Sequence, residues 1–408
     1  MLFGKYGTDR AEGINYERMR NYRLKRAVDQ MNKDGLGCLV TWEAWNIRYL
    51  TGVYVTHPVK WTEGQCVILM KDGNYYVNAM YCFDRSEMEV EMPWLKGKML
   101  PALGGGKRAF TKEELGGVVN KVAELMAKHG VSKEPLGLDG CSLQLLYQEA
   151  FKDVGINVVD ARRTMFEARK IKNQDEIECH RIACANADAA FADIVDAIRP
   201  GIRECDLVGI GIGRLYKEGA DETQEFVCSS GQRTSSLHID YTDKQIQPGD
   251  LVIVDINGNS YQGYKSCYYR TFCCGKATAD QKALYKENVD MLYGAMNAVK
   301  AGNTTWDVAS KWPDSPKYWG FDDWAHVTAL AVGHGIGIPL HEIPSISYPV
   351  SKADPIVLEE GMVLALETWT GKKGGKYGVR LEEDIVVTKD GYDLLTKFPV
   401  NELIECWR

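Results

Sequence analysis

The stretch Leu251–Gly275, LVIVDINGNSYQGYKSCYYRTFCCG, has the pattern of two buried strands joined by a turn. Within it, Asp255 directly follows the apolar run Leu251–Val254, where a polar residue is not expected. Burying an acid is costly unless the carboxylate is paired or bound to a cation. The pattern therefore predicts a hairpin that carries a functional carboxylate.

The other chemically distinctive residues follow this hairpin along the chain. GHGIGIPLHE at 333–342 contains His334 and His341 among glycines that allow close backbone approach. ALETW at 365–369 places Glu367 at the end of an apolar run, and GVRLEED at 378–384 places Glu382 in an alternating strand. Acids and histidines in this order predict one pocket that holds a metal ion or an organic cation.

Composition narrows the class of protein. The chain has 408 residues, of which 45% are hydrophobic and 26% charged, with a net charge of −7 from interleaved acids and bases. This balance argues against nucleic acid or an anionic membrane as the main partner. No apolar stretch approaches the ~20 residues of a membrane span, and the N-terminus lacks the pattern of a signal peptide. We expect a cytoplasmic protein.

The twelve cysteines are scattered, and none forms a CxxC pair. A zinc ribbon or a thioredoxin-type site is therefore not expected, and we expect the thiols to be reduced.

Two domains are predicted. Helical and strand patterns alternate over the first part of the chain, and a charged stretch near 165–172 then opens a new long helix. We predict an α/β domain over residues 1–165 and a catalytic domain over residues 166–408.

Several motifs together resemble the pita-bread superfamily, which includes creatinase, aminopeptidase P, prolidase, ectoine hydrolase and the DddP-type dimethylsulfoniopropionate lyase. They are NIRYLTG at 46–52, EARKIKNQDEIECHR at 167–181, GHGIGIPLHEIP at 333–344, ALETW at 365–369 and GVRLEEDIVVT at 378–388. The resemblance covers nearly the whole chain. It implies an α/β (α+β) protein with an N-terminal creatinase-type domain and a C-terminal pita-bread catalytic domain.

The metal-dependent members of this superfamily use five ligands, Asp, Asp, His, Glu and Glu. By motif, His334, Glu367 and Glu382 match the last three. The two Asp positions depart from the pattern: Cys267 stands at the second, and Asp255 and Asn257 precede it by twelve and ten residues. The spacing of Asp255, Asn257 and Cys267 is most similar to that of the DddP-type branch. Two-metal sites rely on bridging carboxylates, so an amide at Asn257 and a thiol at Cys267 argue against a dinuclear centre. We expect no metal; the alternative is one divalent ion (Zn, Fe or Mn).

The resemblance also implies roles for residues around the pocket. His238 matches a catalytic acid/base, and His341 a second histidine, acting with Glu367 and Glu382. Residues that would contact a cationic substrate are Asp255, Tyr268, Tyr269, Trp369 and Arg380. In the homodimers of this superfamily, a loop of the N-terminal domain caps the partner's site, which implies a role for Lys60 and Trp61.

The leading hypothesis is a creatinase- or ectoine-hydrolase-like enzyme that cleaves a C–N bond in a small cationic or zwitterionic substrate. Three alternatives stay open. They are a DddP-type lyase acting on an onium acid, an Xaa-Pro-type metallopeptidase, and a non-catalytic binding protein.

Overall fold

The structure is a computed structural model that describes residues 13–54, 64–78, 85–104, 109–235, 239–327 and 330–407. The chain divides into two compact units. Residues 15–169 form the first, and residues 170–408 form the main part of the second. The predicted boundary, between residues 165 and 166, falls within α6 (Arg162–Arg169).

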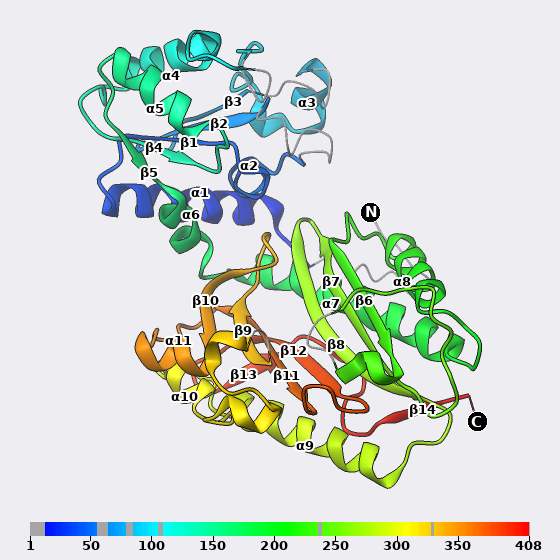
Figure 1. The fold of residues 1–408 in the computed structure, drawn as a ribbon. Helices are drawn as coiled ribbons and strands as arrows, with labels where there is room; N and C mark the ends of the chain where they lie inside the picture. Colours follow the sequence, from blue (N-terminus) through cyan, green and yellow to red (C-terminus); the bar gives the residue numbers. More distant parts are fainter. Residues whose placement is uncertain are drawn as a thin grey trace. The chain divides into compact units, whose positions relative to one another are not determined.

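The N-terminal unit is built on a five-stranded sheet with the order β3-β2-β1-β4-β5 (Figure 1). β1 pairs antiparallel with β2 and parallel with β4, and β4 pairs parallel with β5. The strands are β1 (Cys38–Thr41), β2 (Cys66–Met70), β3 (Tyr75–Asn78), β4 (Leu136–Asp139) and β5 (Val158–Asp160).

Helices cover both faces of this sheet. α4 and α5 bury apolar side chains against one face, together with Val40, Ile68 and Leu138. α1, α2 and α6 lie on the opposite face (Figure 1). The helices are α1 (Tyr16–Lys33), α2 (Ala44–Thr51), α3 (Arg85–Glu91), α4 (Gly116–Lys128), α5 (Gln144–Asp153) and α6.

The C-terminal unit contains two sheets. One has the order β14-β8-β7-β6, and the other has the order β10-β9-β11-β12-β13. The first contains β6 (Glu225–Ser230), β7 (Leu251–Tyr261), β8 (Tyr264–Cys274) and β14 (Ile404–Cys406). The second contains β9 (Ala331–Gly335), β10 (Glu342–Ser347), β11 (Val363–Thr370), β12 (Val379–Val387) and β13 (Tyr392–Leu394).

Side chains join the two sheets along β8 and β12. Thr271 Oγ1 donates to Arg380 O at 2.7 Å and accepts from Arg380 N at 3.0 Å. Arg270 Nη1 donates to Glu382 O at 2.6 Å. Because the two central strands are fixed to each other, residues on both contribute to one site.

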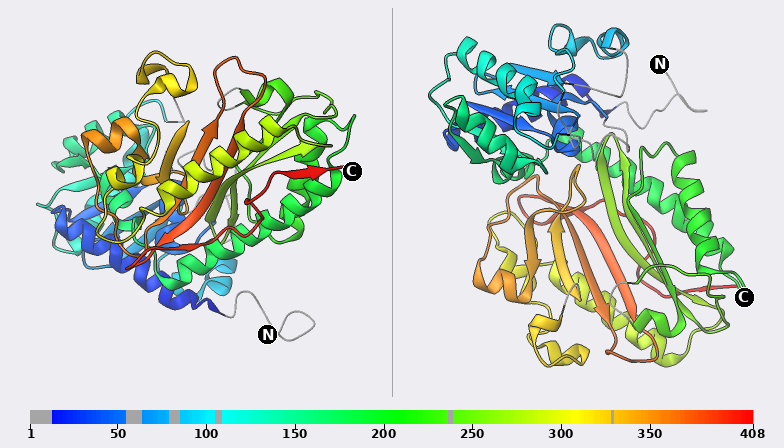
Figure 2. Two further views of the ribbon diagram at one scale, coloured as in Figure 1. Left: turned by 90° about the horizontal axis from the view of Figure 1, so that it is seen from below. Right: turned by 45° about the horizontal axis from the view of Figure 1, so that its top comes forward.

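Long helices pack on the outer faces of these sheets. α7 (Gln174–Ala197) and α8 (Glu204–Lys217) share a core with β6, β7 and β8. α9 (Ala279–Met296) packs across β11 and β12 (Figure 2). The shorter helices are α10 (Thr305–Ala309) and α11 (Tyr348–Ala353). This arrangement confirms the predicted α/β architecture.

Two further properties concern the described part of the chain. None of its helices combines the length and the apolarity that crossing a membrane requires. Every cysteine in it is a free thiol.

Candidate active site

The hairpin of β7 and β8 places its polar residues by register. Asp255 lies opposite Tyr269, and Asn257 lies opposite Cys267. The register then shifts at Gly258, which adopts a φ of +71°. A Cβ atom there would lie 2.7 Å from Gln224 Cβ, so this bulge requires glycine.

The second sheet brings the remaining ligand candidates to adjacent positions. Glu367 of β11 lies directly opposite Glu382 of β12, and Ala365 lies opposite His334 of β9. Like charges at directly opposite positions destabilise a sheet, so the acids here need a counter-charge.

Cys267 lies at the centre of the site. Its Sγ is 2.7 Å from Asn257 Oδ1, 3.4 Å from Glu382 Oε1 and 4.0 Å from His334 Nε2. Asn257 Nδ2 in turn donates to Asp255 Oδ2. The structure therefore connects the altered positions, Asn257 and Cys267, directly to the retained acids.

Glu367 already has a counter-charge. Arg380 donates from Nε at 2.9 Å and from Nη2 to the same oxygen, Glu367 Oε2. The guanidinium also lies 4.6 Å from the centroid of the Tyr269 ring. Arg380 is the ion-pair partner of Glu367; its role as a substrate contact stays a prediction.

His334 has a fixed tautomer. Its Nδ1 lies 2.9 Å from Gly335 O and must donate there, which leaves the Nε2 lone pair facing Cys267. Burial, followed by the nearby His341, lowers the pKa of His334 to about 4. A neutral imidazole with a free Nε2 is the form that binds a metal ion.

Two carboxylates in this site have oxygens without partners. Asp255 Oδ1 and Glu382 Oε2 are buried and accept no hydrogen bond. Burial raises the pKa of both groups, and the charge of Glu367 raises each further, while Tyr269 opposes the shift at Asp255. Buried acceptors without donors at one place indicate that a cation belongs there.

The described residues contain one matching set of ligand atoms. Sγ of Cys267, a ring nitrogen of His334 and a carboxylate oxygen of Glu382 all lie within 4.8 Å of one another. Of the six predicted metal ligands, these three converge. Asp255 and Asn257 form a hydrogen bond with each other next to these three ligands, and Glu367 forms an ion pair with Arg380.

Three other predicted residues lie around this site in different surroundings. Tyr268 is wrong as a substrate contact, because strand alternation turns it into the core against Phe191, where its OH donates to Asp188. Trp369 is buried, with its Nε1 donating to Thr234 O at 3.1 Å. His341 is exposed, with its ring centroid 4.3 Å from that of His334.

His238, Lys60 and Trp61 lie outside the described residues.

Two structural partners of the site were not predicted. Asp384 Oδ2 accepts from Cys267 N at 2.9 Å and from Cys184 Sγ at 3.5 Å. Because Asp384 is two residues beyond Glu382 in a strand, alternation already indicated the same face. Lys172 Nζ lies 2.7 Å from Glu342 Oε2, a contact between distant segments for which the sequence carries no signal.

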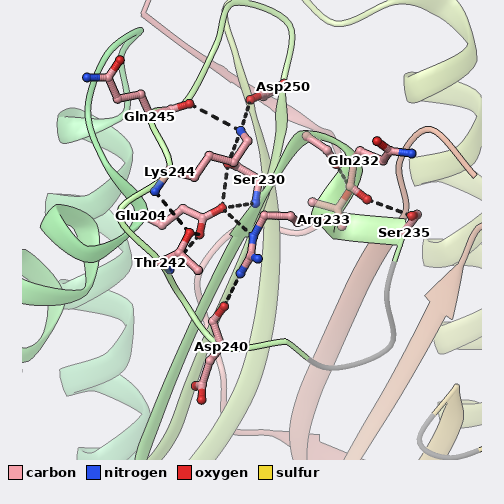
Figure 3. Close-up of polar contacts among 12 residues, drawn as sticks. Glu204, Ser230, Gln232, Arg233, Ser235, Asp240, Thr242, Lys244, Gln245 and Asp250 are labelled. Atoms are coloured by element: carbon pink, nitrogen blue, oxygen red, sulfur yellow. Dashed lines mark hydrogen bonds and ion pairs between the residues drawn. The ribbon is translucent and has the colours of Figure 1, made fainter. Parts of the chain in front are cut away.

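Away from this cluster, the buried acid Glu204 forms hydrogen bonds with the segments before and after residues 236–238 (Figure 3). Its Oε1 accepts from Ser230 N and Oγ at 2.8 Å and from Arg233 Nε at 3.3 Å. Its Oε2 accepts from Thr242 N and Oγ1 at 2.9 Å. Separately, Thr234 Oγ1, next in the chain to Arg233, accepts from Gly378 N at 3.0 Å, just before β12 begins.

Comparison with known proteins gives consistent matches. Residues 178–389 match metallopeptidase family M24, and residues 23–171 match the creatinase/prolidase N-terminal domain. An Xaa-Pro dipeptidase of Pyrococcus furiosus is 33% identical over 382 residues, which is 92% of this chain and 97% of that protein.

Solved structures agree on the fold. An Xaa-Pro dipeptidase from Bacillus anthracis has a TM-score of 0.76 at 24% identity, covering 94% of this chain and 99% of that one. The prolidase from Pyrococcus furiosus has a TM-score of 0.68 at 25% identity, covering 91% of this chain and 99% of that one.

Together the comparisons confirm the resemblance to the pita-bread superfamily and the expected hydrolase class, whereas the lyase alternative gains no support. The chain belongs to metallopeptidase family M24 and carries an N-terminal domain of the creatinase/prolidase type.

Proposed function

We propose that this protein hydrolyses Xaa-Pro-type dipeptides with the help of one divalent metal ion held by Cys267, His334 and Glu382. Relatives named Xaa-Pro dipeptidase support this substrate class over the creatine-like substrates of our leading hypothesis. The observation that carries the proposal is the convergence of three buried ligand atoms within 4.8 Å of one another.

The residues present fit one metal ion better than two. A dinuclear site needs carboxylates that bridge the metals, and here an amide and a thiol stand at two of the ligand positions. Arg380 also occupies Glu367 Oε2 with two N–H groups. A sulfur, a nitrogen and an oxygen donor form a set that suits zinc in an open catalytic site.

When bound, a divalent ion supplies Lewis-acid polarisation and activation of water. The protein's own groups prepare the surroundings. Gly335 O fixes the tautomer of His334, and Arg380 neutralises Glu367. Glu382 Oε2, which lacks a donor, is available to accept a proton. His341 is exposed beside His334, where it can bind the carboxylate of a small peptide.

The proposal keeps the role of His238 as proton donor and acceptor. It also keeps a homodimer in which Lys60 and Trp61 of one chain cap the partner's site. Sedimentation analysis tests the dimer. Mixing His238→Ala chains with Lys60→Ala chains tests the cap, because mixed dimers would regain activity only if each site uses residues from both chains.

The decisive experiment is a turnover assay on a substrate panel, with zinc and with chelator. We expect hydrolysis of Xaa-Pro dipeptides that zinc restores after chelation and that Cys267→Ala abolishes. Inactivity toward every Xaa-Pro dipeptide, in the presence of each of Zn, Mn, Fe and Co, would refute the proposed substrate class.

A metal-free, creatinase-like reaction is the second candidate. It is favoured by one observation: Arg380 already pairs with Glu367, and the neighbouring acids have oxygens without donors that would suit an organic cation. Chelator-resistant cleavage of a guanidino or onium acid, with no cleavage of Xaa-Pro dipeptides, would favour this candidate.

A further inference from the structure

The N-terminal unit contains a cavity of about 330 Å³ that the M24 chemistry does not use. It lies at the carboxyl ends of the parallel strands β1, β4 and β5, which end at Thr41, Asp139 and Asp160. Its lining comes entirely from residues 43–169. Its volume is within the range of small-molecule sites.

The topology of the sheet places this cavity where ligands bind in open α/β folds. After β1 the chain enters α2 on one face, and after the neighbouring β4 it enters α5 on the other face (Figure 1). Divergent connections at adjacent parallel strands open a crevice outside their carboxyl ends. Gly140 adopts a φ of +68° at the edge of this crevice. A Cβ atom there would lie 2.6 Å from Glu43 Cβ, so glycine is needed for the backbone to approach Glu43 this closely.

Two acids, Asp139 and Glu43, line the cavity together with the buried cation Arg169, whose charge acts on both. Asp139 is only 3% exposed, and both of its donors reach the same oxygen: Thr41 Oγ1 donates to Oδ2 at 2.6 Å, and Asn46 Nδ2 donates to Oδ2 as well. Oδ1 of this cavity-lining residue has no donor among the described residues. Glu43 lines the same cavity.

The lining also offers groups that bind anions. Arg162 lines the cavity with an exposed side chain, and its guanidinium has no hydrogen-bond or ion-pair partner in the described part of the chain. Gln144, the first residue of α5, also lines it, and no side chain caps the start of this helix. First-turn N–H groups without a cap bind carboxylates well.

We propose that this cavity is a binding site for a free amino acid, with the ammonium group at Glu43 and Asp139 and the carboxylate at Arg162 and the start of α5. Acidic and basic groups together in the lining of a cavity of this size match a small zwitterion. Burial raises the pKa of Glu43, with Asp139 adding to the effect, and burial also raises the pKa of Asp139; the charge of Arg169 opposes both shifts without cancelling them. An ammonium group between these carboxylates would reduce what remains of both shifts.

Calorimetric titration of the full-length protein tests this site, with L-alanine, L-proline and L-leucine as probes. Ethylamine and propionate serve as half-ligands, since each keeps only one charged group of alanine. We expect saturable binding of at least one amino acid, and much weaker binding of both half-ligands. Glu43→Gln and Arg162→Gln should each weaken binding about tenfold or more, because each removes a charged hydrogen-bonding partner.

Two control proteins complete the experiment. Glu124→Gln removes an exposed acid of α4 that pairs with Lys121, and should bind like the wild type. Glu382→Gln alters the M24 site and should also bind like the wild type, which excludes amino acids bound to a metal there. The inference fails if the wild type binds no amino acid, if the half-ligands bind as tightly, if Glu43→Gln and Arg162→Gln both leave affinity unchanged, or if Glu382→Gln abolishes binding.

Discussion

Glu204 and Glu382 are both fully buried glutamates of the C-terminal unit, but their surroundings differ. Both oxygens of Glu204 accept hydrogen bonds from Ser230, Arg233 and Thr242. Glu382 has one oxygen near a thiol and the other without any donor. A buried acid whose oxygens are all satisfied stabilises a fold, whereas clustered acids with unsatisfied oxygens destabilise it unless something else binds.

Substituting the two glutamates should therefore give different results. Glu204→Ala leaves the surrounding donors unpaired and should lower the free energy of unfolding by about 3–5 kcal/mol. Glu382→Gln replaces a buried carboxyl whose raised pKa favours its neutral form, and should change the free energy of unfolding by less than about 1 kcal/mol in metal-free protein. Urea denaturation with chelator measures both. Equal losses for the two variants would contradict the contrast.

Arg380 extends the comparison, because it gives Glu367 a cationic partner, which Glu382 lacks. Arg380→Met should cost about 3 kcal/mol in metal-free protein, since it leaves Glu367 buried without its partner. Added zinc or manganese should restore much of this loss by pairing with the freed carboxylate. The same denaturation assay with and without metal provides the measurement; a loss that no divalent metal reduces would argue against Glu367 as a latent ligand.

His180 shows that one unsatisfied atom does not make a site. It is buried, its Nδ1 lies 2.8 Å from Lys265 O, and its Nε2 has no partner. Burial, with the nearby Lys172 adding to it, lowers the pKa of His180 from 6.5 to about 3. The unfolded chain takes up a proton below pH 6.5 that the folded protein does not, so stability falls with falling pH between these values.

The expected loss from this histidine is about 1.4 kcal/mol for each pH unit well below the unfolded pKa. His180→Asn keeps a donor toward Lys265 O and should remove this part of the pH dependence. Unfolding free energies of both proteins between pH 5 and pH 7 measure the difference. Parallel pH profiles for the two proteins would show that His180 is not held neutral.

Local patterns predicted much of this site. The alternation of GHGIG indicated a strand that turns His334 to one face, and β9 confirms it. The apolar run before Asp255 predicted a buried strand, and β7 is buried throughout its first ten residues. In the same way, strand alternation places Cys267 and Tyr269 on one face of the sheet and Tyr268 on the other. Applied to all three residues, it would have predicted that Tyr268 points away from the site.

Other features depend on how distant segments pair in the fold, and local sequence patterns do not predict that pairing. The ion pair of Arg380 with Glu367 requires the pairing of β11 with β12, which no single segment specifies. The donors around Glu204 come from segments up to 38 residues away. The N-terminal cavity collects residues from the ends of three strands that are widely separated in the sequence.

The central claim is that Cys267, His334 and Glu382 form a site for one metal ion. Metal analysis of purified protein reconstituted with Co²⁺, combined with its absorption spectrum, tests it most directly. We expect one ion per chain with a thiolate-to-cobalt charge-transfer band that Cys267→Ser abolishes, while Cys184→Ser retains it. Two ions per chain, no bound metal, or a spectrum unchanged by Cys267→Ser would contradict the account.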